Sequence, residues 1–336
     1  MKTTRAALLF LTALTVIAAS NGYRSMGRIS IGGDGGWDYL TVDSEARRLY
    51  VSHATHVAVV DLDSEKVVGD IPDTPGVHGV AIARALNRGY TSNGRANNVT
   101  VFDLQTLKLV AQVATGQNPD AIWYDSASNK VFTFNGRSKD ATVIDAATNQ
   151  VAATIPLGGK PEFPAADGHG KIYVNIEDTH EIAEIDVAKL SVTKRYVLSG
   201  CEDPSGLAMD SKSRRLFSVC GNKVMAVSDP DSGKVVASLP IGAGADGAGF
   251  DADLGLAFSS NGEGSLTVVH KVAGKYEVME TVKTQRSART MAIDPKTHKI
   301  YLSAAELGPA PAPTAQQPRP RPQPLPGTFG VLVIGR

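Results

Sequence analysis

A tandem repeat of about 42 residues constrains the fold of this chain more than any other feature of its sequence. One aromatic residue recurs in a short β-rich run, with steps of 40, 42, 41, 44, 41 and 43 residues, at Tyr50, Tyr90, Phe132, Tyr173, Phe217, Phe258 and Tyr301. A second series closes a later run, with steps of 42, 42, 41, 42 and 42 residues, at Asp61, Asp103, Asp145, Asp186, Ser228 and His270. Because two independent series keep one period, the chain is predicted to contain seven tandem units.

Each unit contains four short strand patterns. In the third unit they lie at residues 120–125, 130–135, 141–145 and 150–155, rich in β-branched and aromatic residues and bounded by turn residues. No stretch keeps a 3.6-residue apolar period. Seven such units predict an all-β fold, a seven-bladed β-propeller with four antiparallel strands per blade.

The two ends of the repeat array predict how the propeller closes. The last unit has strand patterns at 290–294, 299–303 and 329–334 but lacks a fourth, and Arg28–Ile31 has no partner in the first unit. This N-terminal segment is expected to be the outer strand of blade seven, because closure protects the sheet edges. Residues 21–336 are therefore predicted to form a single domain.

Two segments fall outside the repeat. Residues 1–20 have Lys2 and Arg5 ahead of an apolar run at 6–19, with small residues at Ala18 and Ser20, and predict a signal peptide. The run is too short for a membrane anchor, and no later stretch is apolar enough to cross a bilayer. The Pro-rich insertion 307–327 holds eight of the 18 prolines. It is either a flexible loop without a role or a lid or docking segment.

The charge balance and the expected export limit which partners the protein can have. The chain has 34 basic and 34 acidic residues, so no basic excess for binding nucleic acid is present, and none is expected as a partner. The expected location is periplasmic or secreted, with no transmembrane segment after removal of the signal.

The repeat resembles a known family at segments 98–125 (NVTVFDLQTLKLVAQVATGQNPDAIWYD) and 140–163 (DATVIDAATNQVAATIPLGGKPEF). These resemble the YVTN-type repeat of YncE-like β-propellers, over about residues 28–336. The resemblance implies an exported propeller and no particular reaction. The chain departs from the pattern at His270, which stands in place of the Asp after the third strand of blade six, and at the insertion in blade seven.

One position of the repeat predicts a polar ring at the mouth of the central channel. Just before the first strand of each unit, the aligned residues are Asp38, His78, Asp120, Glu162, Ser205, Asp246 and Arg289. We call this set the inner ring. It is expected either to be a solvated funnel or to bind a cation or small polar ligand. Carboxylates suit Ca²⁺ or Mg²⁺, and a histidine favours a transition metal. Asp120, Glu162 and Asp246 are the candidate ligands of a divalent metal.

A second ring is expected near the ends of the second strands, on the same face. Its candidate binding residues are His53, Asn93, Asn135, Asn175, Glu177, Glu202, Asn261 and Glu306. Asn-Gly pairs at two of these positions also suit simple turns.

The two cysteines, Cys201 and Cys220, lie at the start and the end of antiparallel neighbours in blade five. An oxidising setting favours a disulfide between them, with two free thiols as the alternative. No nucleophile motif or Cys-x-x-Cys-His haem motif is present.

Three functions remain open from the sequence. The first is a binding or scaffold protein that takes a small polar ligand, a peptide or a protein on its channel face. The second is a metal-assisted hydrolase of the lactonase type, with the metal at the channel mouth. The third is an accessory protein in redox or haem metabolism. Catalytic residues are unassigned, and fold alone cannot choose.

Overall fold

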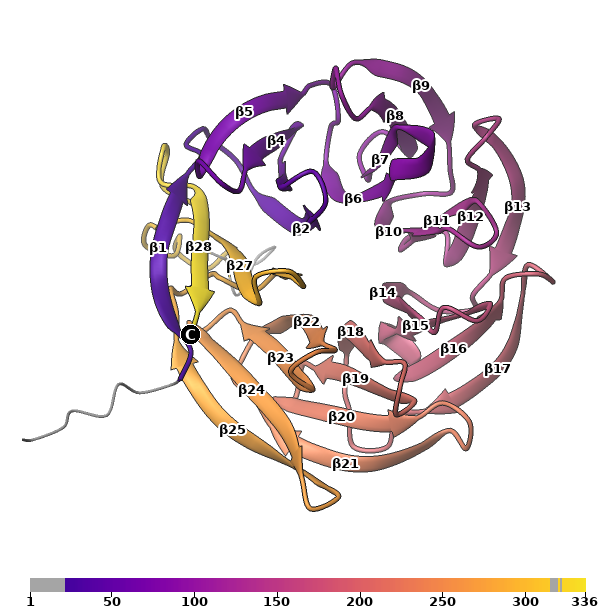
Figure 1. Ribbon diagram of the computed structural model, residues 1–336, viewed down its shortest axis with the longest axis vertical. Coiled ribbons are helices and arrows are strands. Elements are labelled where there is room, and N and C mark those ends of the chain that lie inside the picture. The colour runs from indigo at the N-terminus through magenta and orange to yellow at the C-terminus, as the bar shows by residue number, and fades with distance from the viewer. Residues whose placement is uncertain (1–21, 315–319, 321) are drawn as a thin grey trace, which may run out of the picture.

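The computed structural model describes residues 22–314, 320 and 322–336. The expected signal peptide, residues 1–20, lies outside the described residues. In the described part, 28 strands form seven four-stranded antiparallel sheets, arranged as blades around a central channel (Figure 1). The predicted seven-bladed β-propeller is therefore confirmed.

The blades share one strand order from the channel outward. The innermost strands are β2 (Trp37–Asp43), β6 (Val77–Ala83), β10 (Pro119–Asp125), β14 (Pro161–Ala166), β18 (Pro204–Asp210), β22 (Ala245–Asp251) and β26 (Met291–Asp294). The second strands are β3 (Arg48–His53), β7 (Arg88–Asn93), β11 (Lys130–Asn135), β15 (Lys171–Ile176), β19 (Arg215–Cys220), β23 (Leu256–Asn261) and β27 (Lys299–Ala304). The third strands are β4 (His56–Asp61), β8 (Asn98–Asp103), β12 (Asp140–Asp145), β16 (Glu181–Asp186), β20 (Val224–Asp229), β24 (Ser265–Val272) and β28 (Gly330–Gly335). The outer strands are β5 (Lys66–Ile71), β9 (Leu109–Ala114), β13 (Gln150–Pro156), β17 (Ser191–Val197), β21 (Lys234–Pro240), β25 (Lys275–Lys283) and β1 (Arg24–Ser30). Two 3₁₀ turns, η1 (Arg84–Leu86) and η2 (Glu177–Thr179), complete the described elements.

The N-terminal strand closes the last blade, as predicted. β1 pairs antiparallel with β28, with Arg24 opposite Gly335 and Ser30 opposite Gly330 (Figure 1). It begins four residues earlier than the pattern at 28–31 indicated. Ile29 on this strand is 1% exposed and packs with the core shared by blades one and seven. Burying such a side chain contributes roughly 1.5–3 kcal/mol, which holds the closing strand in place.

The aromatic series forms the core between blades. All seven of these side chains are at most 1% exposed. Tyr50 packs on Phe102 of the next blade at 5.9 Å between ring centroids, and the Tyr90 hydroxyl donates to the carbonyl of Ala146 in blade three at 3.1 Å. Each repeat unit therefore supplies one aromatic residue to the packing against its neighbours, which explains why the period is kept.

The second series has a turn-forming role. Asp145 Oδ1 accepts hydrogen bonds from backbone N–H groups two and three residues later, both at 3.0 Å. In blade five the same contacts are made by Asp229, at 2.9 and 3.0 Å. The expected landmark Ser228 is thus one residue out of register, because the aspartate ends the strand and bonds the turn.

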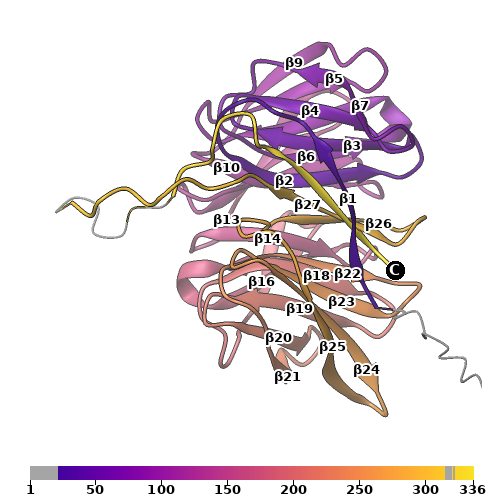
Figure 2. The same cartoon turned by 90° about the vertical axis from the view of Figure 1, so that its left-hand side faces the viewer.

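The Pro-rich insertion connects β27 to β28 and projects from one face of the propeller (Figure 2). Its two sides pair at the base, where Gly308 N–H donates to Gln323 O at 2.9 Å and Leu325 N–H to Glu306 O at 2.8 Å. Gly327 N–H donates to Gly33 O at 3.1 Å. The base of the insertion is therefore fixed to the propeller.

Within the described residues, no helix has the length and apolar character needed to cross a bilayer.

Candidate functional site

The inner ring lies in the innermost strands. Six of its members are the second residue of their strand, and Arg289 lies two residues before β26. The sequence placed these residues just before the strands, so the strands begin slightly earlier than expected. The innermost strands surround the central channel (Figure 1). Because the ring residues lie at or just before the start of these strands, the seven blades bring equivalent positions to one end of the channel.

Three blades bring a histidine between two carboxylates. His78 Nδ1 lies 2.6 Å from Asp38 Oδ2 and 3.4 Å from Asp120 Oδ1. Burial would lower the pKa of His78, but the hydrogen bond to Asp38 and the charges of Asp120 and Asp38 raise it to about 9. His78 is therefore an imidazolium at neutral pH in the absence of another cation.

The next carboxylates along the ring crowd one another. Burial, then the charge of Asp120, raises the pKa of Glu162, and burial likewise raises the pKa of Asp120. Lys160 Nζ lies 2.7 Å from Glu162 Oε1 and also pairs with Glu177. This lysine offsets part of the negative charge, and no sequence signal had marked it.

Tyr39 is a further residue of the site that the sequence did not identify. Its ring packs on Phe163 with centroids 5.0 Å apart. Burial raises its pKa well above 10, and the charges of Asp120, Asp38, Glu162 and Asp246 raise it further. The phenol therefore stays protonated within the field of all four ring carboxylates.

The opposite part of the ring is internally paired. Arg289 forms an ion pair with Asp246 and lies 3.8 Å from Asp38 Oδ1 through Nη2. Ser205 Oγ donates to the carbonyls of Ala245 and Asp246 at 3.2 and 3.4 Å. Asp246 is thus neutralised by a neighbour, whereas the sector of Asp38, His78 and Asp120 carries excess negative charge.

Three side chains of that acidic sector lie close enough together to hold a metal ion. Ligand atoms of Asp38, His78 and Asp120 all lie within 4.8 Å of one another. This group shares Asp120 with the set expected from the sequence. A metal held by Asp120, Glu162 and Asp246 stays a prediction.

The second ring divides into buried and exposed members. Asn93, Asn135, Asn175 and Asn261 are 0% exposed and His53 is 1% exposed. Asn135 Nδ2, for example, donates to Asp140 Oδ1 at 2.7 Å and Thr142 Oγ1 at 2.9 Å. These contacts favour a structural role inside the blades over contact with a ligand.

The acidic members of the second ring differ. Glu177 joins the inner ring through Lys160, whereas Glu202 and Glu306 are exposed on loops. Glu177 is thus the member that the structure brings to the inner ring.

Cys201 and Cys220 form the predicted disulfide, with Cα atoms 5.4 Å apart. It ties the loop before β18 to the end of β19, both in blade five.

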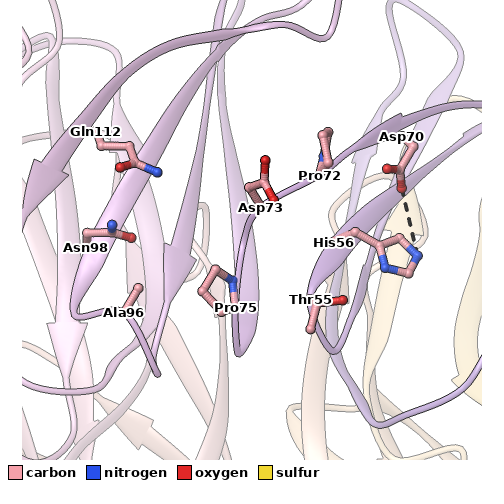
Figure 3. Close-up of a pocket in the computed structure, with 9 residues that line it drawn as sticks. All are labelled: Thr55, His56, Asp70, Pro72, Asp73, Pro75, Ala96, Asn98 and Gln112. Atoms are coloured by element: carbon pink, nitrogen blue, oxygen red, sulfur yellow. Dashed lines mark ion pairs between the residues drawn. The ribbon is translucent and has the colours of Figure 1, made fainter.

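A separate hollow of about 770 Å³ lies between blades one and two (Figure 3). His56 and Asp70 face each other on one side of it, 3.8 Å apart between Nε2 and Oδ1, and Asn98 and Gln112 lie on the other side. None of the inner-ring residues lines it, so this polar groove is distinct from the channel mouth.

Comparison with known proteins identifies the fold. No family model matches the chain, and no curated protein matches it. Among solved structures, a hydrazine synthase chain from Kuenenia stuttgartiensis superimposes with a TM-score of 0.70 at 15% identity, covering 84% of this chain and 96% of that one. At this identity the likeness shows the propeller fold alone.

Proposed function

We propose that this protein is an exported, YVTN-type β-propeller of one domain that binds a small, positively charged polar ligand at its channel mouth. The observation that supports this most is the acidic sector of the inner ring, where Asp38, His78 and Asp120 converge from three blades. Binding, rather than a reaction, is the function that this arrangement supports best.

The charges of the site favour a cation. Five carboxylates, those of Asp38, Asp120, Glu162, Glu177 and Asp246, face three basic groups, those of His78, Lys160 and Arg289. The raised pKa values of Asp120 and Glu162 reflect the cost of holding negative charge in a partly dehydrated place. A bound cation relieves that cost, so cation binding and carboxylate ionisation support each other.

The ligand atoms in the acidic sector suit a divalent metal. Two carboxylate oxygens and one imidazole nitrogen are the donors that Mn²⁺ and Zn²⁺ accept. Asp38, His78 and Asp120 would hold such an ion.

Calorimetric titration with Mn²⁺, Zn²⁺ and a diamine tests the proposal. The double variant Asp120→Asn/Glu162→Gln is expected to lose at least about tenfold in affinity for these cations while staying folded. Asp253→Asn is the matched control, because Asp253 is exposed on a hairpin turn away from the ring. Equal affinities in all three proteins would refute the proposed site.

A metal-assisted hydrolase of the lactonase type is a second candidate, favoured by the same histidine and carboxylates. A metal held there would supply Lewis-acid polarisation of an ester carbonyl. Lactone hydrolysis that requires added Mn²⁺ or Zn²⁺ and is lost in His78→Ala would support it. A role in redox or haem metabolism stays a prediction.

Export is supported by the Cys201–Cys220 disulfide, because such bonds persist in oxidising compartments. N-terminal sequencing of the protein recovered from the periplasm or medium is expected to begin at Asn21.

A further inference from the structure

A cavity of about 600 Å³ joins the channel mouth to the base of the Pro-rich insertion. Asp246 and Arg289 of the inner ring line its inner end, together with Trp37. Leu307, Pro322 and Pro324 of the insertion line it as well. The insertion therefore encloses a volume that the seven repeats alone would leave open.

The wall formed by the insertion is ordered by its own contacts. Leu307 and Pro324 face each other as an antiparallel bridge, beside the hydrogen bond between Gly308 N–H and Gln323 O at 2.9 Å. Proline fixes its own backbone φ, so the wall loses little conformational entropy when a ligand arrives. The described base of the insertion is thus preorganised.

The charges in this cavity have the opposite sign to those of the acidic sector. Asp246 and Arg289 neutralise each other in an ion pair. The third charged lining residue is Arg286, which is exposed and forms no ion pair within the described part of the chain. The lining therefore carries one net positive charge, and a free guanidinium recognises carboxylates in a two-point geometry.

Apart from Ser287 and Gln323, the remaining lining residues are glycines and apolar residues, among them one aromatic residue, Trp37. Trp37 stacks on Phe329 with centroids 5.3 Å apart and an angle of 27° between the rings, which fixes the orientation of the indole. Leu307, Pro322 and Pro324 add apolar surface to the lining, so a ligand that enters the cavity meets apolar groups both from β2 and from the insertion. Sites of this kind bind ligands with a flat apolar body and one polar group.

We propose that this cavity binds a small organic carboxylate with a flat apolar body, held by Arg286 and packed between Trp37 and the insertion. The site goes beyond the proposed cation binding, because it takes a ligand of opposite charge on a different wall of the mouth. It also gives the Pro-rich insertion a role as one wall of a binding site.

Titration calorimetry with three probes tests the charge and the apolar body separately. Indole-3-acetate supplies both features, indole-3-acetamide lacks the charge, and acetate lacks the ring. The first is expected to bind at least about tenfold more tightly than either of the others. Equal affinities for indole-3-acetate and indole-3-acetamide would overturn the proposal. No binding of indole-3-acetate at millimolar concentration would overturn it as well.

Two variants assign the site. Arg286→Gln is expected to reduce indole-3-acetate affinity about tenfold, whereas Arg137→Gln, at an exposed arginine on the loop between β11 and β12 of blade three, should leave it unchanged. Equal losses in both variants would place the anion elsewhere. Pro322→Gly/Pro324→Gly should also weaken binding by loosening the wall, and unchanged binding would remove the insertion from the site.

Measuring Mn²⁺ binding to the Arg286→Gln variant tests the cation site separately from the carboxylate site. The cation site shares no residue with this substitution, so Mn²⁺ affinity should be retained there. Loss of indole-3-acetate binding with Mn²⁺ binding intact supports two sites, and failure of either measurement refutes only its own site.

Discussion

Lowering the pH from 7 to 5 is expected to destabilise this propeller through His53 by about 2 kcal/mol. The His53 imidazole is 1% exposed and packs on Phe329 and His56, with ring centroids 4.4 and 4.8 Å apart. Both of its ring nitrogens are buried without a hydrogen-bond partner among the described residues. Burial, then the charge of His56, lowers the pKa of His53 from 6.5 to about 4.

The sign and size of this change in stability follow from the depressed pKa of His53. Between about pH 4 and pH 6.5, His53 is protonated in the unfolded chain but not in the folded protein, so the free energy of unfolding falls as the pH decreases. A difference of about 2.5 pKa units corresponds to about 3.4 kcal/mol when complete, below pH 4. At pH 5 about 2 kcal/mol of it has been lost, and above about pH 6.5 the contribution is fully present.

Urea unfolding at pH 7 and pH 5 measures this effect when wild type is compared with His53→Leu. The substitution has its own cost, but that cost is the same at both pH values and cancels from the comparison. Wild type should lose about 2 kcal/mol more than the variant between the two pH values. His169→Gln, at an exposed turn, serves as the control and should behave as wild type. Identical losses in wild type and His53→Leu would refute the reasoning.

Three further outcomes are expected. Cys201→Ala/Cys220→Ala, which opens a link across 19 residues, should lower the free energy of unfolding by about 3 kcal/mol in calorimetry, and reduction of wild type should do the same. Ile29→Ala should cost about 2–4 kcal/mol in urea unfolding, because it leaves a cavity under the closing strand. Asn135→Leu should destabilise the fold by about 1–3 kcal/mol while Mn²⁺ affinity stays unchanged, since among the described residues the side-chain amide of Asn135 forms hydrogen bonds only within blade three. A loss of Mn²⁺ affinity in this variant would return the second ring to the binding site.

The architecture could be predicted because each repeat unit contains the residues that its own packing and turn require. The buried aromatic of each second strand and the turn-forming aspartate each have a local cause, so their period survives changes elsewhere in the unit. The register slipped only in blade five, where Asp229 rather than Ser228 makes the turn contacts. That distinction depends on which of two neighbouring polar residues ends the strand.

The inner ring could be located but its contacts could not. The pairing of β2 with β3 shifts register between Trp37 and Leu40, and the equivalent shift occurs in β10 between Pro119 and Ile122. Such bulges break the two-residue alternation, so the sequence does not tell which side of the strand Tyr39 faces. Ion pairs such as that of Lys160 with Glu162 depend on rotamers and are equally invisible to spacing.

The structural role of the buried asparagines could have been predicted from a pattern in the sequence. A hydroxyl two residues earlier on the same strand donates to the side-chain oxygen in three blades, as Thr133 does to Asn135 at 3.1 Å. This recurring Thr/Ser-x-Asn pattern marks an amide that is satisfied inside the blade. Polarity alone had suggested contact with a ligand.

The pairing of β1 with β28 also sets the order in which the molecule can fold. β1 is synthesised before the other described strands, but Arg24 can pair with Gly335 only after β28 has been made. β1 is therefore the last of these strands to pair. Six blades can form from hairpins that are local in the chain, while the seventh joins residues almost a full chain length apart. Closing a loop of about 300 residues costs only about 2 kcal/mol more than closing one of 40, because the entropy grows with the logarithm of length. Ring closure is therefore thermodynamically cheap but kinetically late, and the unpaired edge of β28 is the surface most exposed to misassembly until it occurs.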